Sequence, residues 1–83
     1  MNIKNKDGGD WVATRHIGWI VATAGRIDLE PLFVSRHETP TNFLPAGFRA
    51  ILKDIDIDGK AWIYHDNYGV IRMPRELLVA WDR

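Results

Sequence analysis

Two turn motifs in the last third of the chain constrain its fold more than any other feature. Asp58-Gly59 separates two stretches of alternating apolar residues, and Asp66-Asn67-Tyr68-Gly69 separates the second stretch from a third. An Asp-Gly pair between apolar runs is typical of a tight β-hairpin, because a type I′ turn needs positive φ at both central positions. The sequence therefore predicts two consecutive antiparallel hairpins over residues 48–73.

The two predicted turns also fix a register. The first turn sets Ile55 opposite Trp62, and the second sets Trp62 opposite Met73. A change of parity near Lys53-Asp54 predicts a β-bulge in the first strand. Together the two turns place one apolar set on a single sheet face. Its members are Ile55, Ile57, Trp62, Tyr64, Ile71 and Met73.

The first half of the chain is more irregular. Residues 17–24 form an uncharged, β-branched run that predicts a strand buried on both sides, with a bend at Gly18. Residues 27–34 alternate, but Pro31 interrupts them and predicts an edge strand or a bulge. Residues 35–47 contain two prolines and no sustained period, which predicts a long loop of the kind that is often functional.

The closing stretch carries a resemblance to a known fold. Its residues are Ala61-Trp62-Ile63-Tyr64, Gly69-Val70-Ile71-Arg72-Met73-Pro74 and Leu77-Leu78-Val79. Pro74 suits the first position of a short helical turn, and the residues after it fit a strand. This pattern resembles the end of SH3-like small barrels, in which a short 3₁₀ turn after a proline leads into the last strand. The resemblance implies a fold, and it implies no activity.

The expected fold class is mainly β, or a small α+β fold: an antiparallel, SH3-like, partly open barrel. We expect residues 1–10 to be a flexible polar lead-in and residues 11–83 to be one small domain, since 83 residues rarely hold two. The expected core consists of Trp19, Val21, Ile27, Leu29, Phe33, Leu52, Ile55, Ile57, Trp62, Ile63, Ile71, Met73, Leu77 and Val79.

Several motifs that carry chemistry in other proteins are incomplete here. Asp54, Asp56 and Asp58 alternate as in the first half of a calcium-binding loop, but His65 stands where the bidentate glutamate belongs. The three histidines are widely separated, and without cysteine no zinc-ligand pair is present. The segment 35–38 places serine, histidine and glutamate side by side, where they cannot converge as a catalytic triad. We therefore expect no metal, no cofactor and no catalysis.

The composition favours a binding protein. Eleven Lys plus Arg balance eleven Asp plus Glu, and the neutral sum argues against a protein whose main task is to coat nucleic acid. We expect Trp11 and Tyr68 to be exposed aromatic side chains at a partner surface. In the 35–47 loop, Phe43 is the expected anchor, and its polar surround is Arg36, His37 and Asn42. The pair Phe43-Leu44 has two possible fates: it presents apolar surface, or it plugs the core.

These observations predict a non-catalytic, cytoplasmic module that binds a macromolecule, and they favour a protein over a nucleic acid as the partner. On size alone, such proteins include phage or mobile-element inhibitors such as the anti-CRISPR proteins. The alternative is an SH3-like or Sm-like module that binds nucleic acid through arginines such as Arg15, Arg49 and Arg72, and the third class is a small metal-dependent enzyme. No apolar run is long enough for a membrane span, and either a monomer or a homodimer is compatible with the sequence.

Overall fold

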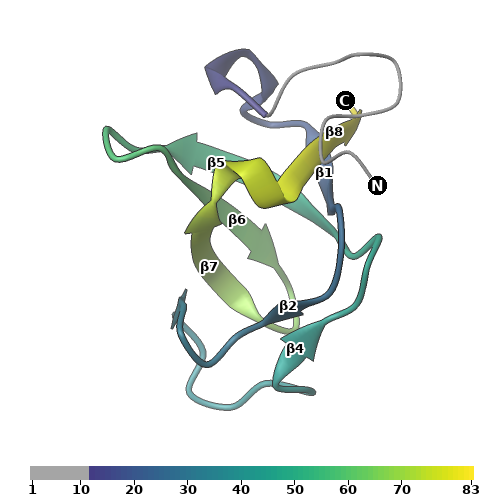
Figure 1. The fold of residues 1–83 in the computed structure, drawn as a ribbon, viewed down its shortest axis with the longest axis vertical. Helices are drawn as coiled ribbons and strands as arrows, with labels where there is room; N and C mark the ends of the chain where they lie inside the picture. Colours follow the sequence, from purple (N-terminus) through teal and green to yellow (C-terminus); the bar gives the residue numbers. More distant parts are fainter. Residues whose placement is uncertain (1–11) are drawn as a thin grey trace.

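The computed structural model describes residues 12–83, which form two antiparallel sheets (Figure 1). The strands are β1 (Ile20–Thr23), β2 (Ile27–Asp28), β3 (Phe33–Val34), β4 (Phe43–Leu44), β5 (Arg49–Ile55), β6 (Lys60–His65), β7 (Gly69–Pro74) and β8 (Leu78–Asp82). Two short 3₁₀ helices accompany them, η1 (Thr14–His16) and η2 (Arg75–Leu77).

The larger sheet has the strand order β3-β7-β6-β5-β1-β8, and β2 pairs with β4 in a separate ribbon. Every pairing is antiparallel. Strands from opposite ends of the chain, β1 and β8, lie side by side (Figure 1). The prediction of a mainly β, antiparallel fold is confirmed, and residues 12–83 contain no α-helix. No helix within that range is long and apolar enough to cross a membrane.

Both predicted hairpins are present, but their turns differ from the predicted type. Gly59 has φ +79°, and no residue other than glycine in residues 12–83 has positive φ, so Asp58 cannot take part in a type I′ turn. The N–H of Gly59 donates to the Asp56 carbonyl at 2.9 Å, and the N–H of Asp56 donates to the Lys60 carbonyl at 2.9 Å. Such a three-residue loop, a type I turn followed by a left-handed glycine, ends in a G1 bulge.

The second hairpin differs from the first in the position of its left-handed glycine, because Gly59 donates the hydrogen bond of the first turn whereas Gly69 follows the donor Tyr68. The N–H of Tyr68 donates to the His65 carbonyl at 3.1 Å, and His65 pairs with Gly69, whose φ is +73°. The predicted four-residue turn therefore contains three loop residues, and its glycine belongs to the ladder.

Each of these loops moves the register by one residue from the predicted one. Ile55 pairs with Ala61 rather than Trp62, and Ala61, not Trp62, pairs with Met73. A slip of one residue turns a strand over, so the predicted shared face is wrong. Trp62 and Tyr64 point away from the core, and Ala61 and Ile63 take their place. The bulge predicted near Lys53-Asp54 is confirmed by a register shift between Leu52 and Asp54.

The observed core lies on the inner face of the sheet. It consists of Val12, Val21, Ile27, Leu29, Leu44, Ala50, Leu52, Ala61, Ile63, Tyr68, Ile71, Met73 and Leu78. The prediction is wrong for two core residues: Ile57 stands at a turn tip with 99% of its surface exposed, and Phe33 is 54% exposed on the edge strand. Half-buried positions are taken by Trp19, Ile55, Trp62, Leu77 and Val79.

The long buried strand predicted over residues 17–24 is shorter than expected. The chain leaves η1 through Gly18, whose φ is +93° and whose N–H donates to the Leu52 carbonyl at 2.8 Å. The strand begins only at Ile20, and Ile17 and Ile20 are exposed. The bend expected at Gly18 is present, and it separates the apolar run into a turn and a strand.

Prolines mark two further boundaries as the sequence predicts. The 27–34 segment breaks at Pro31 into β2 and β3, of which β3 is an edge strand of the large sheet. After Pro74 the chain makes the single helical turn η2 and then enters β8, so the turn-then-strand prediction is confirmed.

The left-handed glycines of the two hairpins, Gly59 and Gly69, should differ in the cost of substitution. A Cβ at Gly59 would meet no atom within 4 Å, whereas a Cβ at Gly69 would overlap the Ser35 hydroxyl and lie 2.9 Å from Arg36 Cγ. We expect Gly59→Ala to lower the free energy of unfolding by about 1 kcal/mol through backbone strain alone. Gly69→Ala should cost roughly 2 kcal/mol or more, because the overlap adds to that strain. Urea unfolding of both variants measures the difference, and equal costs would contradict the close packing of Ser35 and Arg36 against Gly69.

Candidate binding site

Residues 27–44 form a closed excursion from the sheet, which we call the arm. Its two ends are held together by the β2–β4 pairing, in which Ile27 pairs with Leu44. The N–H of Leu29 extends this ladder by donating to the Asn42 carbonyl at 2.9 Å. The long loop predicted over residues 35–47 is therefore partly regular, because β4 lies within it.

Three contacts fasten the far side of the arm to the large sheet. Strand β3 pairs with β7, which sets Val34 opposite Ile71. The hydroxyls of Thr41 and Tyr68 are 2.8 Å apart and share a hydrogen bond. The Arg36 guanidinium donates to the Asp66 carbonyl at 2.7 Å. The arm is thus attached both to a strand and to the β6–β7 turn.

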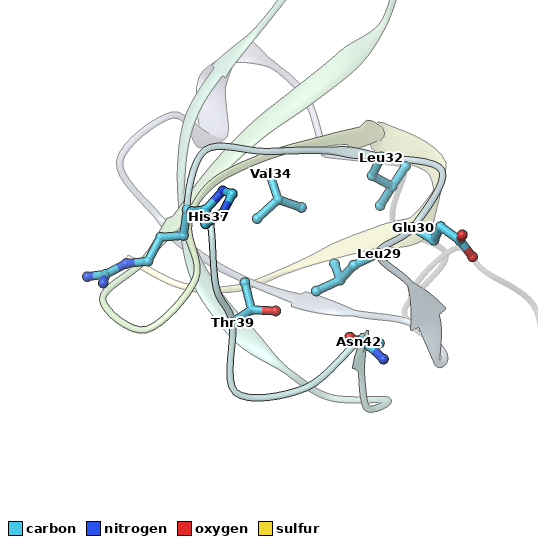
Figure 2. Close-up of a pocket in the computed structure, with 8 residues that line it drawn as sticks. Leu29, Glu30, Leu32, Val34, His37, Thr39 and Asn42 are labelled. Carbon is cyan, nitrogen blue, oxygen red and sulfur yellow. The ribbon is translucent and has the colours of Figure 1, made fainter.

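The arm encloses an open groove of about 430 Å³, which we call the arm groove (Figure 2). Leu29, Leu32 and Val34 point into it and give it an apolar floor. Its rim is polar and consists of Glu30, Arg36, His37, Thr39 and Asn42. An apolar centre surrounded by a polar rim is the usual arrangement of protein interfaces.

The rim carries charge that is available to a ligand. Among residues 12–83, Arg36 makes no ion pair, since its only polar contact is to a backbone carbonyl. Glu30, Arg36 and His37 are all exposed. Chemically, the arm groove can take an apolar side chain on its floor and orient the groups beside it through both signs of charge.

The structure brings together three of the six predicted partner-binding residues. Arg36, His37 and Asn42 all line the arm groove. Phe43 does not line it. Its ring is half-buried, with the Arg26 guanidinium 3.9 Å from the ring centroid. Its neighbour Leu44 is completely buried, so this half of the apolar pair is a core plug.

The expectation that Tyr68 is exposed is wrong. Only 5% of its surface is accessible, because its ring packs against Phe48 and His65. Its position in a turn suggests exposure, but this turn lies under the arm, where the Thr41 hydroxyl contacts its phenol. The sixth predicted residue, Trp11, lies outside the described residues.

Sequence reasoning misses the groove floor. The pattern predicts Leu29 in the core, and it predicts Leu32 and Val34 in a strand that Pro31 interrupts. Leu32 and Val34 alternate with the exposed Phe33, and this alternation after a proline is the one indication that both share a face. Leu29 joins them through a turn in which the Leu32 N–H donates to the Leu29 carbonyl at 2.9 Å, and the sequence pattern does not show that the three side chains surround one hollow.

The acidic hairpin motif has a structural role in the fold. The Asp56 carboxylate accepts hydrogen bonds from the Asp58 and Lys60 amides at 2.9 and 3.0 Å. It also accepts from the Trp62 indole at 3.0 Å and from Arg72 at 2.8 Å. Its oxygens are therefore engaged by the turn and by the outward-facing side chains of β6 and β7. Within residues 12–83, no three metal-ligating side chains gather at one point.

Two groups have shifted pKa values, and neither lines the arm groove. Partial burial acts to raise the pKa of Asp56, but the four hydrogen bonds outweigh it and lower this pKa to about 2. Burial, and secondarily the charge of Arg15, lowers the pKa of His16. The His16 ring accepts the Ala13 N–H at 3.0 Å and packs edge-on against Trp19, so this histidine is a packed structural residue.

Comparisons with protein-family models, curated protein sequences and solved structures find no match for this chain.

The hydroxyl contact between Tyr68 and Thr41 predicts how firmly the arm is held. Tyr68→Phe should lower the free energy of unfolding by about 1 kcal/mol, because it leaves the partly buried Thr41 hydroxyl with one partner fewer. Amide exchange should accelerate in residues 39–43 more than in β6 and β7. Tyr64→Phe is the matched control, since the hydroxyl of Tyr64 makes no hydrogen bond within residues 12–83 and the side chain is exposed. Equal effects of the two substitutions would contradict this role.

The low pKa of Asp56 predicts a pH dependence of stability. Because its folded pKa of about 2 is below the ordinary value of 3.8, the unfolded chain takes up the proton first as the pH falls. The stabilisation is therefore complete above pH 3.8 and is lost as the pH falls toward 2. Unfolding measured across this window should show a weaker pH dependence in Asp56→Asn than in the wild type. Asp54→Asn controls for the loss of one carboxylate, since within residues 12–83 the Asp54 carboxylate accepts only the Ile55 amide.

Proposed function

We propose that the protein is a non-catalytic module that binds another protein through the arm groove. The observation that carries the proposal is the groove itself, a hollow of about 430 Å³ with an aliphatic floor and a charged, exposed rim. Two floor residues, Leu32 and Val34, are partly exposed, and covering exposed apolar surface with a partner is favourable. The rim supplies orientation, because Arg36 and Glu30 offer opposite charges beside the same floor.

The charge distribution supports a protein partner over a nucleic acid. Arg72 is paired with Asp56 at 2.8 Å and with Asp58 at 3.4 Å, and Arg26 is paired with Asp28 at 3.6 Å. Binding to a phosphate backbone needs a surface whose positive charge is not neutralised. These pairs remove part of the positive charge that the alternative function requires.

The environment of Ser35 supports a non-catalytic function. Its hydroxyl accepts the Val70 N–H at 2.8 Å and so takes part in the attachment of the arm to β7. A nucleophilic serine needs a base within hydrogen-bond reach, and Ser35 has no such contact to a histidine in the described part of the chain. Its role in the proposal is to hold the arm.

The finer form of the proposal is an SH3-like inhibitor protein that acts in the cytoplasm. The strand order β7-β6-β5-β1-β8, with η2 between β7 and β8, supports the SH3-like part of it. Phage or mobile-element origin is the narrowest version and rests on the small size of the chain. A protein that acts by occupying a partner needs a surface such as the arm groove and no chemistry of its own.

Site-specific photo-crosslinking tests the proposed function. A photo-reactive amino acid at position 32, on the groove floor, should capture one protein from a host lysate. The same group at position 57, fully exposed at a turn tip, should not capture it. With that protein purified, Leu32→Ala should weaken binding by roughly 1–2 kcal/mol, and Ile57→Ala should leave it unchanged.

Salt dependence separates the two classes of partner. Binding through the arm groove should weaken only modestly as salt rises, whereas binding to DNA or RNA should fall steeply as counterions are released. Tight, strongly salt-dependent binding to generic nucleic acid, reduced by Arg49→Ala and unchanged in Leu32→Ala, would overturn the proposal. Crosslinks that form equally at positions 32 and 57 would also contradict it.

A further inference from the structure

The outer face of the large sheet exposes apolar side chains that the arm groove does not use. Ile20, Ile51 and Tyr64 are 37%, 42% and 37% exposed. In the register, Ile20 pairs with Ile51, and Ile51 pairs with Tyr64, so the three stand in one row across β1, β5 and β6. We call this row the apolar stripe. Contiguous exposed apolar surface on a small domain marks an interaction site more often than scattered residues do.

The apolar stripe is also hollowed. A depression of about 220 Å³ lies along it, and the residues that line it are Ile20, Arg49, Ala50, Ile51, Tyr64, His65 and Asp66. None of these residues lines the arm groove, so the two surfaces are separate. Trp81, which is 55% exposed, extends the apolar area because the Arg49 guanidinium lies 4.3 Å from its ring centroid.

The charges around the stripe are of both signs. Arg49 from β5 and Asp66, which directly follows β6, both line the depression, and neither forms an ion pair within residues 12–83. A surface that carries one cation and one anion beside an apolar centre, neither of them in an ion pair within residues 12–83, is complementary to a second copy of itself. The chain as a whole is neutral, so two copies do not repel each other through net charge.

We infer that the apolar stripe is the contact surface of a homodimer and that its occupant is a second copy of this chain. A two-fold symmetric interface uses the same patch twice, so each residue i that contacts j is matched by j contacting i. An axis that runs along the strands between β5 and β6 sets Ile51 of one copy against Tyr64 of the other. The same axis sets Arg49 against Asp66, and each charge then gains an ion-pair partner that it lacks within residues 12–83.

Sedimentation across micromolar to millimolar concentrations tests the dimer. The wild type should pass from monomer to dimer within this range, and Ile51→Lys should raise the dimer Kd by roughly tenfold or more. Ile57→Lys is the matched control, because it makes the same change at an isoleucine that is 99% exposed and lies outside the stripe. Circular dichroism and melting temperature establish that each variant is folded. If Ile51→Lys does not fold, Tyr64→Ala carries the same test.

A charge exchange tests the proposed orientation of the two copies. Arg49→Asp and Asp66→Arg should each weaken the dimer, and the double variant should recover much of the lost affinity. A wild type that is monomeric at all concentrations, or a dimer that Ile51→Lys and Ile57→Lys affect equally, would overturn the inference. A monomer that binds a different protein and loses it in Ile51→Lys would also overturn the choice of occupant.

Discussion

The left-handed backbone of Gly59 and Gly69 is the constraint on which most of this structure depends. Gly59 is the last residue of the loop before β6, and Gly69 is the first residue of β7, where it pairs with His65. Because side chains alternate along a strand, the residue count of each loop decides which half of β6 faces inward. The observed count buries Ala61 and Ile63 and turns Trp62 and Tyr64 to the outside. The core and the exposed surface are therefore fixed by the same two turns.

Gly69 also connects the sheet to the candidate binding site. The space that a Cβ would occupy there is filled by Ser35 and Arg36, which belong to the arm. The Ser35 hydroxyl accepts the amide of Val70, and Arg36 reaches the carbonyl of Asp66 on the other side of the same turn. The arm can close on this turn because the glycine has no side chain. The rim residue Arg36 is thus positioned by the hairpin geometry and by the arm together.

Local sequence pattern is sufficient for the fold class, both hairpins, the bulge near residue 53, and the turn and strand after Pro74. It fails on register. In the first hairpin, an Asp-Gly pair suits both a two-residue type I′ turn and a type I turn with a G1 bulge, which differ by one residue. In the second hairpin, Gly69 pairs with His65 and so belongs to the strand and not to the turn. The two predicted hairpins agree with each other only because both slip in the same direction. Arg36, His37 and Asn42 are found because an irregular segment with prolines predicts a loop. The groove floor is missed because the sequence pattern does not show that the turn at residues 29–32 closes the arm around a hollow.

The outward turn of β6 gives its two aromatic residues different surroundings. Trp62 is half-buried, donates to the Asp56 carboxylate at 3.0 Å and has the Phe33 ring 5.8 Å away, so its polar atom and much of its ring already have partners in the chain. Tyr64 stands one step further along the same face, beside Ile51, and is exposed. A domain of this size has one inner face to fill, and the apolar residues that alternate to the other face must be covered internally or remain open. Asp56 and Arg72 cover Trp62, whereas Tyr64, as part of the apolar stripe, stays exposed and is available to another molecule.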